Sequence, residues 1–194
     1  MNHFIDKIPE MVVDYVKSIT ELKKLNIKVV KPRKTKHGDF RERNGNYKIT
    51  INDTNNKYRF LMILIHEIAH FNVLKKKIKE KPHGHNWKYE FKKLAKPILN
   101  NKVFPVDLLI LLKTHMVNPK SSFSYDSDLV KELNKYDSNS DFTYLDEIKD
   151  GFKFKYENNK IYQKIKKRRK RYLCVDMKDR RKYLFLPHAK VQVL

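Results

Sequence analysis

Residues 60–74 read FLMILIHEIAHFNVL, an apolar stretch that contains two histidines four residues apart, His66 and His70, with Glu67 beside the first. Apolar side chains fall on every side of the corresponding helix, which is typical of a helix buried in a core rather than one on a surface. We therefore predict a buried helix over residues 56–77. Because residues four apart share one face of a helix, the two histidines point the same way.

This pattern indicates a metal site with hydrolytic chemistry. Two imidazoles at this spacing can hold one Zn²⁺ at about 2.0–2.1 Å, and the glutamate can reach a water beside the ion without being a ligand. In peptide hydrolysis the carboxylate takes a proton from the water and returns it to the leaving amine. The alternative is that His66, Glu67 and His70 are hydrogen-bonded core residues, but burying them without partners is costly and a metal removes that cost.

A catalytic zinc site needs a third protein ligand and one open position. Two candidates, His83 and His85, lie in the segment PHGHNW at residues 82–87, just past the predicted helix. Its proline and glycine indicate a turn that can fold back over the helix. His115 is a more distant candidate. The residues alone leave the choice between His83 and His85 open.

The motif HEIAH, followed by PHG-x-x-W and a lysine-rich amphipathic helix, resembles the SprT-like metallopeptidases. These include bacterial SprT proteins and the eukaryotic Spartan proteases, which degrade DNA–protein crosslinks. The segments KTKHGDFR (34–41) and YKITIN (47–52) are similar to the strand and turn before the motif in that family. The tail from Arg168 onward resembles the family's C-terminal extension.

The resemblance implies one zinc ion per chain, held by His66, His70 and His83, with Glu67 as the general base. It also implies protein substrates bound or crosslinked to DNA. Many SprT-like proteins carry a four-cysteine zinc ribbon after the protease domain, whereas this chain has one cysteine, Cys174. A second, structural zinc is therefore not expected, and we interpret Cys174 as a small buried apolar residue.

The remaining patterns predict an α+β fold: a zincin-like metallopeptidase core at residues 1–117, a linker at 118–141, and a small C-terminal antiparallel β module at 142–194. Serine-rich polar sequence marks the linker, in which a short helix can form near residues 129–136. Short alternating aromatic runs mark the β module. Other helices are expected at 9–25, 86–96 and 105–115, and strands at 27–30 and 47–52, with a hairpin signal at Asn44-Gly45.

The charge points to a polyanionic partner. The chain has 44 Lys and Arg against 22 Asp and Glu, a formal net charge of +22. Such a balance favours binding to nucleic acid, although surface lysines can also serve solubility alone. The densest cluster is predicted to contact phosphates: Lys164, Lys166, Lys167, Arg168, Arg169, Lys170 and Arg171. The tyrosines among these cations are expected to pack inside the β module. The stretch 75–81, next to the motif, could steer a polyanion.

No signal peptide is expected, because the N-terminus lacks a basic segment followed by an apolar one. The longest apolar run is shorter than the roughly 20 residues that cross a membrane. We therefore expect a cytoplasmic protein with no membrane partner. Its function is predicted to be zinc-dependent cleavage of proteins on single- or double-stranded DNA. The alternatives are a zinc-stabilised nucleic-acid-binding or transcription-associated protein with little or no peptidase activity, or a basic ribosome-associated protein with a chance motif.

Overall fold

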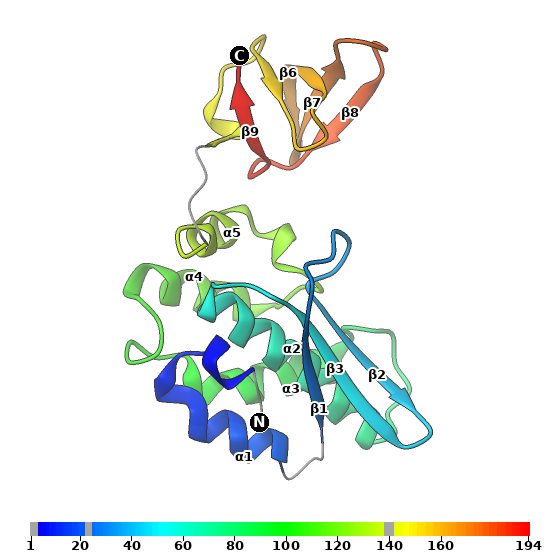
Figure 1. The fold of residues 1–194 in the computed structure, drawn as a ribbon, viewed down its shortest axis with the longest axis vertical. Helices are drawn as coiled ribbons and strands as arrows, with labels where there is room; N and C mark the ends of the chain where they lie inside the picture. Colours follow the sequence, from blue (N-terminus) through cyan, green and yellow to red (C-terminus); the bar gives the residue numbers. More distant parts are fainter. Residues whose placement is uncertain (1–3, 22–24, 138–141) are drawn as a thin grey trace. The chain divides into compact units, whose positions relative to one another are not determined.

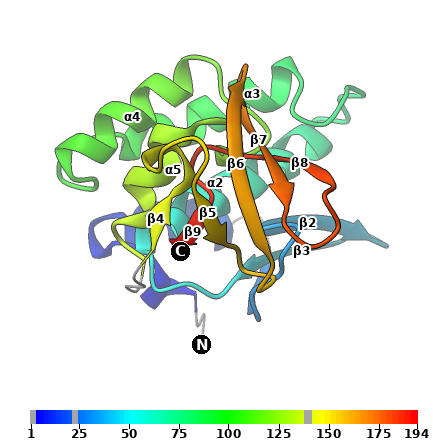
Figure 2. The same cartoon turned by 90° about the horizontal axis from the view of Figure 1, so that it is seen from above.

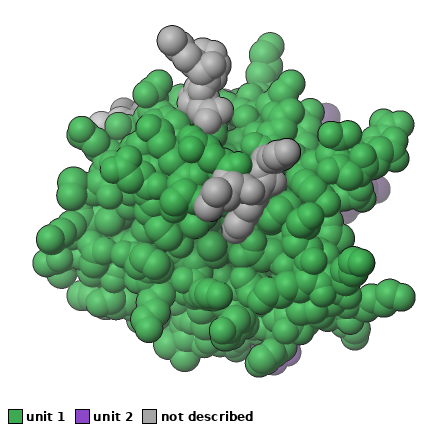
Figure 3. All heavy atoms as spheres, turned by 90° about the horizontal axis from the view of Figure 1, so that it is seen from below, with its two compact units in different colours: residues 1–123, 132–138 green, residues 124–131, 139–194 purple. Residues whose placement is uncertain are grey.

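The computed structural model describes residues 4–21, 25–137 and 142–194, and its fold is α+β, as predicted. Two compact units make up the chain, whose ribbon is drawn in Figure 1. Figure 3 shows the surface of unit 1 in green. Unit 1 covers residues 1–123 and 132–138, and unit 2 covers residues 124–131 and 139–194. The predicted linker, 118–141, contains the regular helix α5 (Ser127–Asn134), and its last residues, 138–141, lie outside the described part of the chain.

Unit 1 contains a three-stranded sheet in the order β1-β3-β2, made of β1 (Asn26–Val30), β2 (Gly38–Arg43) and β3 (Asn46–Asn52). β1 runs parallel to β3, and β2 runs antiparallel to it. Asn44 and Gly45 both have positive φ (52° and 76°), as the two-residue turn of a β-hairpin requires. The hairpin signal at Asn44-Gly45 is confirmed, although no bounds were predicted for its first strand, β2, because the sequence GDFRER is typical of a charged loop.

Helix α2 (Lys57–Lys75) packs against β2 and β3 on one side and against α3 (His85–Ala95) on another (Figure 1). Asn56 caps α2, since its side chain accepts a hydrogen bond of 2.9 Å from the Arg59 N–H. Side chains all round α2 are buried, so the prediction of a core helix is confirmed. This burial fixes the helix against the sheet and thereby fixes the direction of its two histidines.

The other elements of unit 1 complete its core. The helix predicted at 9–25 begins later, because Pro9 leads into a 3₁₀ turn at Glu10–Val12 and α1 spans Val13–Glu21. Helix α4 runs from Val106 to Val117, close to the predicted bounds. None of the helices in the described ranges is long and apolar enough to cross a membrane.

Unit 2 contains an antiparallel sheet in the order β4-β9-β5-β6-β7-β8 (Figure 2). The strands are β4 (Thr143–Tyr144), β5 (Lys153–Lys155), β6 (Ile161–Arg168), β7 (Arg171–Asp176), β8 (Lys182–Phe185) and β9 (Lys190–Val193). Phe154, Tyr162, Tyr172 and Cys174 lie in its core. The tyrosines thus pack inside, as predicted. Cys174 is buried as predicted, and burial raises the pKa of its thiol to about 12.

Candidate metal centre

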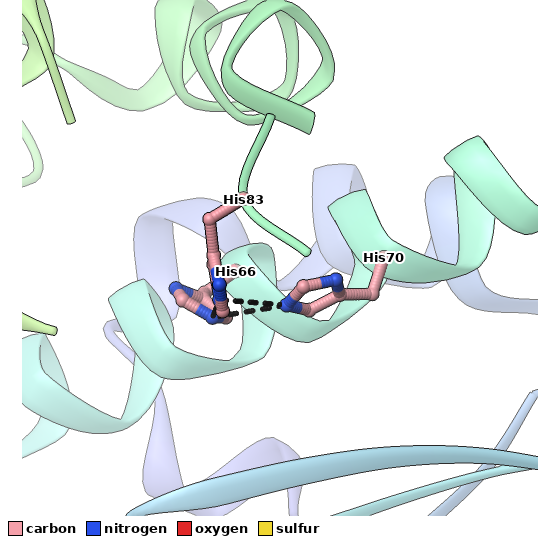
Figure 4. Close-up of side chains that lie close together, drawn as sticks. All are labelled: His66, His70 and His83. Atoms are coloured by element: carbon pink, nitrogen blue, oxygen red, sulfur yellow. Dashed lines mark hydrogen bonds between the residues drawn. The ribbon is translucent and has the colours of Figure 1, made fainter. Parts of the chain in front are cut away.

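Three histidine side chains converge between α2 and the turn before α3 (Figure 4). His66 and His70 lie one helical turn apart on α2, and His83 reaches them from the turn. The Nε2 atom of His70 lies 3.3 Å from that of His66 and 3.0 Å from that of His83, and the remaining pair is 3.1 Å apart. The three residues are therefore close enough to hold a metal ion.

The spacing of these nitrogens fits zinc. Three nitrogens bound to one tetrahedral zinc at about 2.0–2.1 Å would lie about 3.3–3.4 Å from one another. Hydrogen bonds alone do not account for the triangle, because a protonated ring nitrogen can donate but cannot also accept. No choice of tautomers therefore satisfies all three pairs, whereas one shared cation does. Three imidazoles are also a ligand set that suits zinc.

Burial keeps the three imidazoles neutral, the form that binds a metal. The pKa of His66 is held well below its ordinary value by burial, with His70 and His83 adding to the effect. Burial lowers the pKa of His70 to about 4. The pKa of His83 is lowered by burial too, although a hydrogen bond to the Pro82 carbonyl opposes the shift. At neutral pH no proton has to leave before a metal binds.

The backbone before α3 aims His83 at α2. His83 has a φ of 63°, a left-handed conformation that costs a non-glycine residue about 1–3 kcal/mol. The Glu80 carboxylate stabilises this turn by accepting hydrogen bonds from the N–H groups of Asn86 (3.2 Å) and Trp87 (2.9 Å) at the start of α3. Gly84 makes room for that carboxylate, because a Cβ there would lie 2.6 Å from Glu80 Oε2.

Trp87 holds the histidines from the side of α3. Its ring centroid lies 4.6 Å from those of His66 and His83 and 5.5 Å from that of His70. Its Nε1 donates a hydrogen bond of 3.3 Å to the carbonyl of His66. The indole is buried, so it fixes three rings at once. The sequence motif includes Trp87 but did not reveal this contact.

Glu67 is buried on the side of α2 that faces the sheet, and strand β2 holds it. The backbone N–H of Phe40 donates a hydrogen bond to its carboxylate. Burial, helped by the negative charge of Asp39, raises the pKa of Glu67 to about 8. Asp39 itself stays charged, because hydrogen bonds from Lys36 and Arg41 lower its pKa against the effect of burial.

Gly38 is the residue of β2 that lets Glu67 come so close. A Cβ at this position would lie 2.7 Å from Ile63 Cγ2 and 2.9 Å from Glu67 Cγ, and it would be closer still to Glu67 Oε1. Real Cβ atoms almost never approach other heavy atoms to less than 3.0 Å. Nothing in the sequence singles out Gly38, because its role depends on how β2 packs on α2.

A comparison with models of protein families matches residues 6–106 to the SprT-like family. The match covers just over half of the 194 residues and includes His66, Glu67, His70 and His83. The chain belongs to the SprT-like family. Comparisons with curated proteins and with solved structures returned no match.

The family match confirms the resemblance for the core of this SprT-like chain. It ends at residue 106, where α4 begins, so the resemblance of the tail from Arg168 onward stays a prediction. Of the two candidate third ligands, the structure brings His83 to the other histidines. His85 instead lies exposed as the first residue of α3. The other candidate, His115, lies buried in α4 with its ring against Phe123.

The predicted phosphate-binding cluster lies on β6 and β7 of unit 2, and the prediction is wrong for one of its residues. Lys164 was grouped with the phosphate-binding residues, but its side chain is buried. Its Nζ donates a hydrogen bond of 2.6 Å to the Ile148 carbonyl and lies 4.0 Å from the Tyr172 ring centroid. Its place on β6 directs it inward. The other six predicted residues are exposed: Lys166, Lys167, Arg168, Arg169, Lys170 and Arg171.

Replacing His83 with alanine should abolish stoichiometric zinc, whereas His85→Ala should keep one zinc per chain. The expected loss in affinity for His83→Ala exceeds about 100-fold, because losing even an outer-shell partner of a ligand costs about 10–100-fold. Zinc content after dialysis and a competitive chelator titration would measure it. Zinc lost from His85→Ala and kept by His83→Ala would reverse the ligand assignment.

Proposed function

We propose that this SprT-like protein is a zinc-dependent endopeptidase that acts on proteins bound or crosslinked to DNA. The observation that carries the proposal is the buried carboxylate of Glu67, which β2 holds on the same helix that carries two of the three converging histidines. A zinc site that only stabilised the fold would need ligands but no acid at this place. A buried helix that carries both the histidines and the glutamate, packed on a sheet, also supports a zincin-like core.

In this proposal, zinc supplies Lewis acidity towards the scissile carbonyl and the attacking water. A carboxylate oxygen of Glu67 takes the proton of that water and passes it to the nitrogen of the leaving amine. The Phe40 N–H keeps the carboxylate in one orientation during both transfers. Burial raises the pKa of Glu67, which makes its carboxylate a stronger base than that of an exposed glutamate.

The substrate class is supported by the charge and its distribution. Residues 142–194 contain 16 Lys and Arg against 6 Asp and Glu, and the exposed cluster from Lys166 to Arg171 joins β6 to β7. Cations that neutralise phosphates release counterions, which gives binding without sequence preference that weakens with salt. A protein attached to DNA would thus be concentrated near the peptidase.

The experiment that tests this function uses one substrate protein in two states, free and crosslinked to an oligonucleotide. With zinc, the full-length chain should cleave the crosslinked form faster, and a chelator should stop both reactions. DNA binding and stoichiometric zinc without cleavage would favour the alternative function, a zinc-stabilised nucleic-acid-binding protein. A chain with no zinc and no cleavage would contradict both.

The exposed and buried cations of unit 2 should behave differently in DNA binding. Replacing Arg168, Arg169 and Arg171 with alanine should reduce the slope of log affinity against log salt by about 2–3, since each lost phosphate contact accounts for about 0.7–0.9. Lys164→Met should leave the slope unchanged and lower stability by about 1–3 kcal/mol, because it leaves the Ile148 carbonyl unsatisfied. Fluorescence anisotropy across a salt series and urea unfolding would measure the two effects. Equal slopes for both variants would contradict the assignment of phosphate contacts to the exposed arginines and not to Lys164.

A further inference from the structure

A second basic region lies in unit 1, at a cavity of about 1050 Å³. The cavity lies between the β2–β3 hairpin and residues of α2 and α3 that follow the metal ligands in the chain. Its walls carry six cations: Arg41, Arg43, Lys48, Lys75, Lys76 and Lys93. None of them belongs to the cluster on β6 and β7.

Most of this positive charge is not neutralised by the protein. Glu90, the acid among the lining residues, is buried and paired with Lys76, and it accepts a second hydrogen bond of 2.8 Å from Asn72 Nδ2. Arg41 is paired with Asp39 at 2.6 Å. The remaining four cations have no salt-bridge partner within the described residues: Arg43, Lys48, Lys75 and Lys93. The cavity therefore favours an anionic ligand.

An aromatic residue in the lining of the cavity indicates which class of anionic ligand it favours. Tyr47 is half-buried, its ring packs edge-to-face on Phe71 at 5.0 Å, and Lys75 Nζ lies 5.0 Å from its centroid. Cations that follow a backbone, together with an aromatic ring on which a base can stack, are the features of single-stranded nucleic-acid sites. A duplex keeps its bases stacked inside and would leave Tyr47 unused.

We propose that this cavity binds a segment of single-stranded nucleic acid, with phosphates on Arg43, Lys48 and Lys93 and a base against Tyr47. The inference deepens the proposed function, since it adds a nucleic-acid contact to the unit that holds the candidate metal centre. Phe71 directly follows His70 and packs against Phe40 at 6.0 Å. A nucleic-acid strand bound in the cavity would therefore lie beside β2, the β-strand that holds Glu67.

The test compares two triple variants of the full-length chain with equal loss of charge, both made in the Glu67→Gln background so that cleavage plays no part. The cavity variant is Arg43→Ala, Lys48→Ala and Lys93→Ala. The control replaces three exposed lysines of unit 1 that do not line the cavity: Lys17, Lys102 and Lys113. The probe is a fluorescent 20-mer of thymidylate, and its anisotropy is measured across a salt series.

The cavity variant should bind the probe about tenfold more weakly at 0.1 M salt, with a slope lower by about 2, because each single-strand phosphate contact contributes about 0.7. The control should change affinity less than twofold. Tyr47→Ala should weaken binding about fivefold or more, as loss of one stacked base does, and Tyr47→Phe should not. Equal affinities for the two triple variants would overturn the proposal.

A polyglutamate peptide separates nucleic acid from acidic protein as the ligand. Weaker peptide binding by the cavity variant, with unchanged binding of the oligonucleotide, would overturn the proposal in favour of an acidic peptide. Because the readout is binding, an inactive peptidase would not affect this outcome. Loss of cleavage with intact cavity binding would instead count against the proposed function alone.

Discussion

Glu67→Gln should keep the fold and one zinc per chain but lose about 10²–10⁴-fold in peptidase activity, the range that a positioned acid–base group contributes. The amide has the size of the carboxylate, and its oxygen can still accept the Phe40 N–H. It cannot take the proton of a water. The substitution also removes an ionisable group from a buried position, so stability should not fall.

The measurements are kcat/KM on the crosslinked substrate, zinc content and the thermal midpoint, for wild type and Glu67→Gln together. A drop in kcat with unchanged substrate binding would locate the effect in the chemical step. His85→Ala is the matched control, because it alters an exposed side chain close to the site without removing a ligand or the base. Activity of Glu67→Gln within a few fold of wild type would contradict the assigned role.

Gly38→Ala should cost about 100-fold in kcat while zinc remains bound. The added methyl group would collide with Ile63 and with the side chain of Glu67, so the carboxylate has to move. A displacement of about 1 Å at a reacting group is enough for a loss of that size. The three histidines lie on α2 and on the turn before α3, away from this collision, so zinc content is the internal check that the site survives.

Gly45→Ala provides the control for Gly38→Ala. Gly45 lies in the turn of the same hairpin with a φ of 76°, and a Cβ there would meet nothing within 4 Å. Alanine at this position strains the turn and should lower stability by about 1 kcal/mol without lowering the activity of the folded protein. If both variants lost activity in proportion to stability, Gly38 would have no specific role in placing Glu67.

The sequence predicted the parts of the site that depend on spacing along one element. His66, Glu67 and His70 share a helix whose burial is evident from its apolar surround, and their relative positions follow from helical geometry. The third ligand was different. His83 lies in the turn before α3 and His85 is the first residue of that helix, and the choice between them depends on a left-handed backbone at His83, which residue spacing does not encode.

The bounds of strand β2 and its contacts could not be predicted, because they depend on packing between distant segments. Its charged sequence does not indicate a strand. In the structure, however, the Phe40 side chain faces α2, and the Phe40 N–H donates the hydrogen bond that holds Glu67. Lys164 was misplaced for a related reason. The cations that follow it, from Lys166 to Arg171, are solvent-exposed, whereas the position of Lys164 on β6 turns its ammonium group towards the Ile148 carbonyl. Composition gives the charge of a segment, but the alternation of side chains along the strand determines which charged groups face the solvent and which face the core.

The burial of Cys174 makes the native thiol inert towards labelling reagents that attack thiolates, since its pKa is about 12 and its side chain is enclosed. The wild-type sequence is therefore already a background for site-specific labelling. A cysteine introduced at exposed Lys113 in unit 1 and another at exposed Lys182 in unit 2 would carry two spin labels with no need to replace the native residue. Distances between these labels, recorded with and without an oligonucleotide, would reveal whether nucleic acid rearranges the two units.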